Sequence, residues 1–230
     1  MHHAVGCEKQ IVEIEKQSTS IDVIDDLFTI YDRFDVNYID EDGLTHFHVV
    51  CKFGREKIVK EFLDHGADPN GVWTSKGYST LHLVLEAKYN SKTIVQRRQL
   101  FSLLLKSGAD PNLADAEGRT PLHIVCKKPP ESWANSIHPS YDWFLVKMIF
   151  SPCHEKYRPV QINARDKEGN TSLHLDLKTG NRFMVRLLLK NGADPNLADA
   201  DGVVPKDIMR DDEDLAKIYF EKCAVKPSSS

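Results

Sequence analysis

Histidines recur at wide intervals along this 230-residue chain, and a histidine is a candidate metal ligand or catalytic base. Four of them, His48, His82, His123 and His174, lie 34, 41 and 51 residues apart. If each sits on one of a series of packed helices, neighbouring histidines are about 10 Å apart. A zinc ion needs all its ligands at about 2 Å. The spacing therefore predicts a structural role for the four histidines and no metal site.

A second set of chemically capable residues lies close together in sequence and comprises His138, Cys153, His154 and Glu155. An enzyme that uses this stretch is the remote alternative, because no spacing between a nucleophile and a base is identifiable. The H-E-x-x-H, G-x-S-x-G, Walker and G-x-G-x-x-G motifs are absent from the sequence. We therefore predict no catalytic residues and no cofactor. Loss of an activity in His154→Ala, without loss of folding, would favour the enzyme.

The cysteines indicate a reducing environment. Their number is odd and they form no C-x-x-C pair, so neither a disulfide framework nor a zinc knuckle is expected. We predict an intracellular protein, cytoplasmic or nuclear. Cys51 and Cys126 fall at core positions of predicted helices, where buried and inert thiols are expected. The full set is Cys7, Cys51, Cys126, Cys153 and Cys223.

Bulk composition excludes several classes of partner. The net charge is −4, with 41% hydrophobic and 28% charged residues, which is ordinary for a globular protein. A strongly basic balance, as in nucleic-acid proteins, is lacking. No apolar run reaches the roughly 20 residues of a membrane helix, and the first residues lack the features of a signal peptide. We expect a protein partner, neither nucleic acid nor membrane, and a chain that is monomeric alone.

Two phrases repeat along the sequence. The first is GRTPLHIVC at 118–126, with variants GNTSLH at 169–174, GYSTLH at 77–82 and GLTHFH at 43–48. The second is GADPN, at 66–70, 108–112 and 192–196. Gly43 and Gly77 lie 34 residues apart, and Gly169 and Gly202 lie 33 apart. A fixed period of this length indicates a repeat architecture.

These phrases resemble the ankyrin repeat, a unit of about 33 residues with the signature T-P-L-H-x-A. The resemblance covers residues from about Asp22 to Cys223. It implies an all-α ankyrin-repeat solenoid of helix-turn-helix units with β-turn fingers and helical caps. It also implies that the repeated histidine forms hydrogen bonds between neighbouring loops.

The period sets the expected domain boundaries. We predict a flexible N-terminal segment at 1–20, a repeat domain at 21–223 and a flexible tail at 224–230. The domain divides into a cap at 21–37 and units at about 38–70, 71–112, 113–163, 164–196 and 197–223. Intervals longer than the period place insertions near 88–99 and 128–157. The second insertion carries the aromatic residues Trp133, Tyr141 and Trp143, which either bind a partner or fix the insertion to the body.

Helical spacing of apolar residues predicts helices near 46–53, 56–65 and 79–88, and Gly66 ends the second of these. The cap helix shows an apolar stripe at Ile21, Ile24, Phe28 and Tyr31. Leu122 and its equivalents are predicted to point into the stack, namely Leu81, Leu173 and Phe47. The core of the fourth unit is predicted to comprise Leu173, Phe183, Val185, Leu187, Leu188 and Leu189.

Aspartates recur in the predicted fingers, and one more lies in a predicted helix. Those of the fingers, Asp40, Asp115, Asp166 and Asp199, are expected to accept hydrogen bonds from turn amides. Asp176 is unusual because it occupies a small-residue position between helices, and a carboxylate there needs a partner. We expect it to reach water or a nearby lysine or arginine.

The resemblance implies a binding surface made by the finger tips and the exposed side of the first helices. Trp73 and Tyr78 are its strongest candidates, because Trp and Tyr are enriched in binding hot spots. Trp73 packing on the neighbouring finger is the alternative. The other candidates combine acidic fingers with basic helix positions. The full set is Glu41, Asp42, Leu44, Lys52, Phe53, Trp73, Lys76, Tyr78, Glu86, Glu117, Arg119, Lys127, Lys128, Lys167, Glu168, Asn170 and Lys178.

We therefore predict a non-catalytic protein–protein interaction module. A substrate-recognition adaptor of a ubiquitin ligase, or an inhibitor of a transcription factor, is the alternative that the resemblance allows. A passive spacer within a larger assembly is a third possibility, and alanine at Trp73 and Tyr78 separates a spacer from a binding protein.

Overall fold

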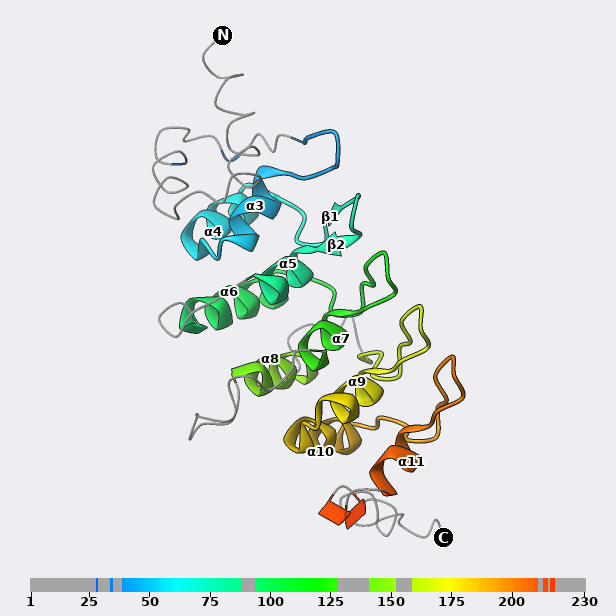
Figure 1. Cartoon of the computed structure of the whole chain (residues 1–230). Helices are drawn as coiled ribbons and strands as arrows, with labels where there is room; N and C mark the ends of the chain where they lie inside the picture. Colours follow the sequence, from blue (N-terminus) through cyan, green and yellow to red (C-terminus); the bar gives the residue numbers. More distant parts are fainter. Residues whose placement is uncertain are drawn as a thin grey trace, which may run out of the picture. The chain divides into compact units, whose positions relative to one another are not determined.

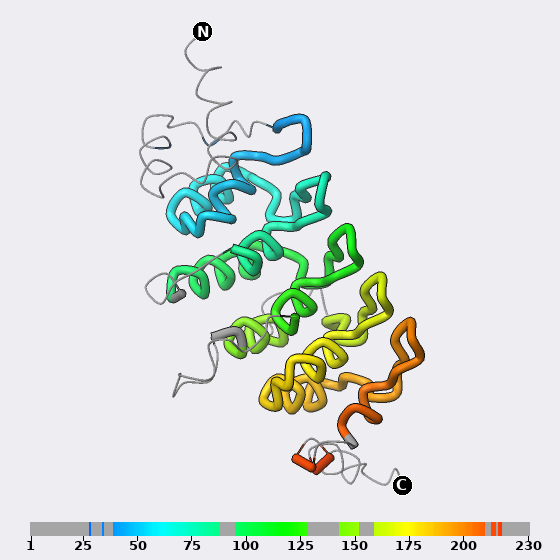
Figure 2. Tube along the Cα trace, viewed as in Figure 1, coloured from blue at the N-terminus to red at the C-terminus, as the bar shows by residue number. Residues whose placement is uncertain are grey.

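The structure is a computed structural model. It describes residues 28, 34, 39–87, 94–127, 141–151, 159–210, 213–214 and 216–217. These residues are mostly helical, with one two-stranded sheet (Figure 1). The described residues up to Ala116 form one compact unit, and those from Glu117 onward form a second. Each unit consists of helix pairs joined by projecting fingers (Figure 2).

The first unit contains two helix pairs with a hairpin between them. Helices α3 (His46–Lys52) and α4 (Glu56–Asp64) form one pair, and α5 (Thr80–Glu86) and α6 (Ile94–Lys106) form the next. The hairpin joins β1 (Val72–Trp73) to β2 (Tyr78–Ser79), with Trp73 opposite Tyr78. Helix α3 packs against α4 and α5, while α6 packs against α4 and α5. One pair therefore stacks on the other, as the repeat pattern predicts.

The second unit continues the same design. Its helices are α7 (Pro121–Cys126), α8 (Tyr141–Phe150), α9 (Ser172–Thr179), α10 (Arg182–Lys190) and α11 (Pro205–Arg210). Helix α9 packs against α7, α10 and α11, and α7 packs against α8. The first helices of successive repeats thus lie against one another. This arrangement is the helix-turn-helix solenoid that the sequence predicts.

The repeated motif sets where each first helix begins. The Thr45 hydroxyl oxygen accepts a hydrogen bond from the backbone N–H of His48, and the Nδ1 atom of the His48 ring accepts one from the backbone N–H of Thr45. Such a capping box satisfies two backbone donors that a helix start would otherwise leave unpaired. Equivalent boxes open α5, α7 and α9.

The second helix of the first repeat ends as predicted. Gly66 has φ 88°, a left-handed conformation that carries no Cβ penalty in glycine. The next amide, from Ala67, donates back to the carbonyl oxygen of Phe62 and closes the helix end. Helix α4 therefore ends at Asp64, one residue before the predicted end.

The predicted core is largely confirmed. Phe47, Leu81, Leu122 and Leu173 are each 1% exposed or less. Phe183 is the exception, since it is 63% exposed and its assignment to the core is wrong. The next residue, Met184, is buried in its place. Val185, Leu188 and Leu189 are buried as predicted, and Leu187 is half-buried.

The N-terminal cap meets the first repeat through aromatic contacts. Phe28 is helical, 2% exposed, and meets Phe62 edge to face at 5.6 Å between ring centroids. Phe34 meets the same ring at 5.3 Å. These contacts cover the apolar face of α4, as a terminal cap should. The other stripe positions, Ile21, Ile24 and Tyr31, lie outside the described residues.

Both predicted insertions contain regular helix. Helix α6 includes residues 94–99, so this part of the first insertion lengthens the second helix of its repeat. Helix α8 lies wholly within 128–157 and is the second helix of its own repeat. Residues 88–93, 128–140 and 152–158 lie outside the described part, and so do 1–20 and 224–230. The proposed boundaries of the flexible ends therefore stay predictions.

The interior also contains the carboxylate of Asp176 and the thiols of Cys51 and Cys126. Asp176 is 0% exposed, so its carboxylate does not reach bulk water, and the expected contact with a nearby lysine or arginine stays a prediction. Cys51 and Cys126 are buried and form no disulfide. Burial raises the pKa of the Cys51 thiol well above its usual range, which keeps it protonated and unreactive.

Candidate functional site

Backbone hydrogen bonds join successive fingers within each unit. The amide of Ser75 donates to the carbonyl oxygen of Asp42 at 3.3 Å, and the amide of Ala116 donates to that of Lys76 at 3.1 Å. In the second unit Lys167 donates to Glu117, and Ala200 donates to Glu168, both at 2.9 Å. The donor and acceptor occupy equivalent places in each finger. The fingers are therefore held by their neighbours, and their side chains are presented from a fixed backbone.

Aspartates shape the individual fingers. One carboxylate oxygen of Asp166 accepts the amides of Glu168 at 3.0 Å and Asn170 at 2.8 Å. Asp40 and Asp199 accept two amides each in the same way. The prediction of turn-stabilising aspartates is confirmed at these three positions.

The repeated histidine bridges repeats through a defined tautomer. The Nδ1 atom of His174 accepts the backbone N–H of Thr171 at 3.1 Å. Its Nε2 atom must then carry the proton, and it donates to the carbonyl oxygen of Val203 at 3.1 Å. His123 forms the same bond to Asn170 in the following finger. The predicted bridging role is thus confirmed for these two histidines.

Neutral histidine fits this arrangement and protonated histidine does not. A proton on Nδ1 would face the amide proton of the capping threonine. Burial lowers the pKa of His174, although the Val203 carbonyl and the nearby charge of Asp199 oppose that effect. Burial also lowers the pKa of His48. These rings are structural groups at neutral pH and are poorly suited to act as bases.

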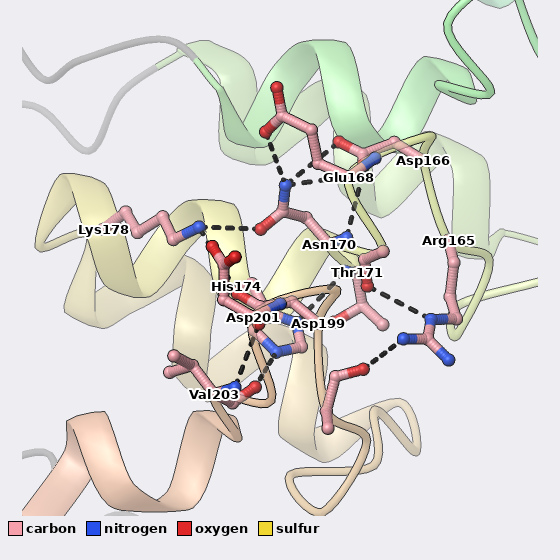
Figure 3. A network of polar contacts seen from close by, with 12 residues as sticks. Arg165, Asp166, Glu168, Asn170, Thr171, His174, Lys178, Asp199, Asp201 and Val203 are labelled. Carbon is pink, nitrogen blue, oxygen red and sulfur yellow. Dashed lines mark hydrogen bonds and ion pairs between the residues drawn. The ribbon is translucent and has the colours of Figure 1, made fainter.

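Lys178 belongs to a polar network at the base of the last two fingers (Figure 3). Its ammonium group donates to Oδ1 of Asn170 at 2.8 Å and lies 3.6 Å from a carboxylate oxygen of Asp199. The Asn170 amide nitrogen donates in turn to Glu168 at 3.0 Å. Burial alone would raise the pKa of Asp199, but the amides of Val203 and Asp201 and the charge of Lys178 together lower it. Lys178 is thus engaged within the protein.

The second finger along the chain is the β1–β2 hairpin, and it brings aromatic and lysine side chains together. The ammonium group of Lys76 lies 4.7 Å from the centroid of the Trp73 ring and 5.8 Å from that of Tyr78. Lys52, from helix α3, lies 6.0 Å from the same indole. Trp73 and Tyr78 meet edge to face at 6.3 Å, and Tyr78 stacks on His82. Burial, followed by the charge of Lys76, lowers the pKa of Lys52. We call Lys52, Trp73, Lys76 and Tyr78 the hairpin cluster.

The structure places most predicted contact residues at the surface. Two positions are buried, Leu44 and Asn170, each 2% exposed. Their assignment to a binding surface is wrong, because Leu44 packs into the core and Asn170 joins the polar network. Lys128 lies outside the described residues. The exposed set is Glu41, Asp42, Lys76, Glu86, Glu117, Lys127, Lys167, Glu168 and Lys178, and the half-buried set is Lys52, Phe53, Trp73, Tyr78 and Arg119.

Sequence reasoning selected the members of the hairpin cluster but missed their mutual contact. The signal was present, since the second finger lacks the aspartate of the other fingers and carries Lys76 where they have an acidic residue. The insertion offers a second aromatic contact, because Lys147 lies 4.2 Å from the Trp143 ring within helix α8. Trp133 lies outside the described residues, and the side chain of Tyr141 is not described.

Two further findings concern the described part of the chain. It holds no group of three or more His, Cys, Asp or Glu residues placed to bind one metal ion. None of its helices has both the length and the apolar character needed to cross a membrane.

Comparison with known proteins gives related sequences in several organisms. A putative ankyrin repeat protein of fowlpox virus is 29% identical over 166 residues, which are 65% of this chain and 84% of that protein. Mouse rabankyrin-5 is 26% identical over 62% of this chain, but the match spans 11% of rabankyrin-5. A probable 26S proteasome regulatory subunit of yeast, p28, is 26% identical over 77% of this chain and 68% of its own length.

Family models match the chain over both units. The model described as "Ankyrin repeats (3 copies)" matches residues 87–199, and the model described as "Ankyrin repeat" matches residues 42–71. Together these matches cover more than half of the sequence, and they coincide with the helix pairs and fingers described above. The chain belongs to the ankyrin-repeat family.

Proposed function

We propose that this protein is a non-catalytic recognition module that binds a protein partner through its finger tips and first helices. The hairpin cluster carries the proposal, because it gathers two aromatic rings and two lysines at the surface of the first unit. Ankyrin repeats are in general protein-interaction modules. Trp and Tyr at partly exposed positions are the residue types that most often dominate binding energy.

The construction of the fingers supports this role. Each finger is fixed by hydrogen bonds to its neighbour, and three of them are also fixed by an aspartate. A preorganised surface loses little conformational entropy on binding, so more of the contact energy remains as affinity. The buried, neutral histidines and the buried cysteines lie beneath this surface, so they have structural roles.

Two narrower roles use the same surface. The module would act as a substrate-recognition adaptor of a ubiquitin ligase, or as an inhibitor of a transcription factor. The identity of the captured partner distinguishes these roles. A transcription factor alone supports the second, and ligase subunits together with a substrate support the first.

Site-specific photocrosslinking tests the proposal. A photoreactive phenylalanine analogue replaces Tyr78 in one variant and Phe183 in another, and each is expressed in cells as the full chain. Phe183 is the matched control because it is an exposed aromatic on the second helix of its repeat. We expect one protein to crosslink through position 78 and not through position 183. Equal crosslinking at both positions, or none at position 78, would overturn the proposed surface.

A further inference from the structure

Lys52 and Lys178 occupy the same place in their repeats, nine residues after the finger glycines Gly43 and Gly169. Lys178 faces the carboxylate of Asp199 in the next finger. In the finger that follows Lys52, the aspartate is missing and the residue nearby is Trp73. The same lysine position therefore meets a carboxylate in one repeat and an indole ring in another.

The second finger then adds a second positive charge. The residue before the finger glycine is acidic at Asp42, Glu117, Glu168 and Asp201, but it is Lys76 in this finger. Lys76 is exposed and lies closer to the Trp73 ring than Lys52 does. Two ammonium groups thus lie near one indole ring, and an anion close to them would offset their mutual repulsion.

Carboxylates of the neighbouring finger do not neutralise Lys76. No carboxylate in the described part of the chain lies within ion-pair distance of its ammonium group. The Asp40 carboxylate is occupied by the amides of Asp42 and Leu44. Glu41 and Asp42 project from the first finger and form no ion pair with Lys76. The positive charge of Lys76 is therefore available to a partner.

The indole nitrogen of Trp73 is a second, independent feature. It is buried and has no hydrogen-bond acceptor. A buried donor without an acceptor is unfavourable, so a partner that supplies one gains affinity.

We propose that the hairpin cluster binds an acidic segment of the partner protein, with a carboxylate held by Lys76 and the chain of the segment packed on Trp73 and Tyr78. This inference rests on the proposed function and names the chemistry of the partner. Charge-assisted hydrogen bonds from the Lys76 ammonium group give the segment its affinity, and the aromatic rings exclude water from them.

The test is an NMR titration of the full ¹⁵N-labelled chain. Hexaglutamate peptide is the probe, hexaglutamine is the neutral control, and inorganic phosphate is a separate arm. The Trp73 indole resonance is assigned from its loss in Trp73→Phe. We expect hexaglutamate to shift that resonance, hexaglutamine to leave it unchanged, and 0.5 M NaCl to weaken binding at least tenfold.

Matched variants make the result specific. Lys76→Glu is expected to weaken hexaglutamate binding at least tenfold. Lys190→Glu, which reverses an exposed charge at the end of the second helix α10, is expected to change it less than twofold. Equal shifts with both peptides, an unchanged affinity in Lys76→Glu, or a phosphate response as strong as that of hexaglutamate would each overturn the inference. Crosslinking through position 78 in the absence of hexaglutamate binding would leave the proposed function standing and remove only the acidic segment.

Discussion

His123 and Asn170 belong to successive repeats, and the ring Nε2 of His123 donates to the backbone carbonyl oxygen of Asn170 at 3.1 Å. The same ring accepts the amide of Thr120 through Nδ1. One side chain therefore completes a helix start and joins two repeats. Because the ring is 0% exposed, water cannot replace either bond.

Replacing His123 should separate these two contributions. His123→Ala removes both bonds and leaves buried polar groups unpaired, so we expect a loss of about 2–4 kcal/mol of unfolding free energy. His123→Gln keeps a side chain that can complete the capping box, so its loss should be smaller. Urea denaturation followed by circular dichroism measures both. Equal losses in the two variants would show that the capping box contributes little.

The finger glycines provide a matched pair for the contact between fingers. Gly169 and Gly202 have φ 77° and 79°, so alanine meets similar backbone strain at both positions. A methyl group at Gly169 would lie 2.7 Å from the backbone nitrogen of Ala200, whereas one at Gly202 meets nothing within 4 Å. We expect Gly202→Ala to cost about 1–2 kcal/mol and Gly169→Ala to cost clearly more. Similar denaturation midpoints for the two variants would count against the close approach of these fingers.

Acidification from pH 7 toward pH 5 should destabilise the protein. Burial lowers the folded-state pKa of His48 and His174, while the unfolded chain takes up these protons near pH 6.5. The unfolded state then binds more protons than the folded state, so the unfolding free energy falls as the pH falls. Denaturant midpoints at pH 7.5, 6.5 and 5.5 measure the slope. The double variant His48→Gln/His174→Gln should show a smaller slope, and an unchanged slope would contradict the buried, neutral rings.

Core packing is tested by one buried and one exposed apolar residue. Leu122 is 1% exposed, so Leu122→Ala should cost about 2–5 kcal/mol. Phe183 is 63% exposed, so Phe183→Ala should change stability by less than about 0.5 kcal/mol. Thermal or urea unfolding of both variants gives the comparison. A midpoint unchanged by Leu122→Ala would contradict the core assignment.

Phe183 also shows that the sequence alone did not determine which residue of α10 is buried. Helical periodicity identified the apolar face of α10, but Phe183 and Met184 are adjacent and only one of them can point inward. The packed neighbours decide which one, and here Met184 is buried at 1% exposure. The finger aspartates, and the bounds of α3, α4 and α5 to within two residues, follow from local motifs, so they could be predicted.

The binding surface depended more on contacts between distant residues. Leu44 and Asn170 were selected by their place in the repeat, yet one packs inward and the other accepts a hydrogen bond from Lys178. The meeting of Lys52 with Trp73 depends on how the second finger folds back as a hairpin. Local spacing identifies which residues lie on a finger, but it does not determine which side chains of neighbouring repeats touch.

The central claim is that the hairpin cluster supplies much of the binding energy for a protein partner. The most direct measurement is the dissociation constant of the purified crosslinked partner for the wild-type chain and for Trp73→Ala/Tyr78→Ala, with Phe183→Ala as control and equal folding checked by circular dichroism. We predict a loss of at least about 2 kcal/mol, roughly 30-fold in affinity, for the double variant and none for the control. Affinity within twofold of wild type in the folded double variant would contradict the claim.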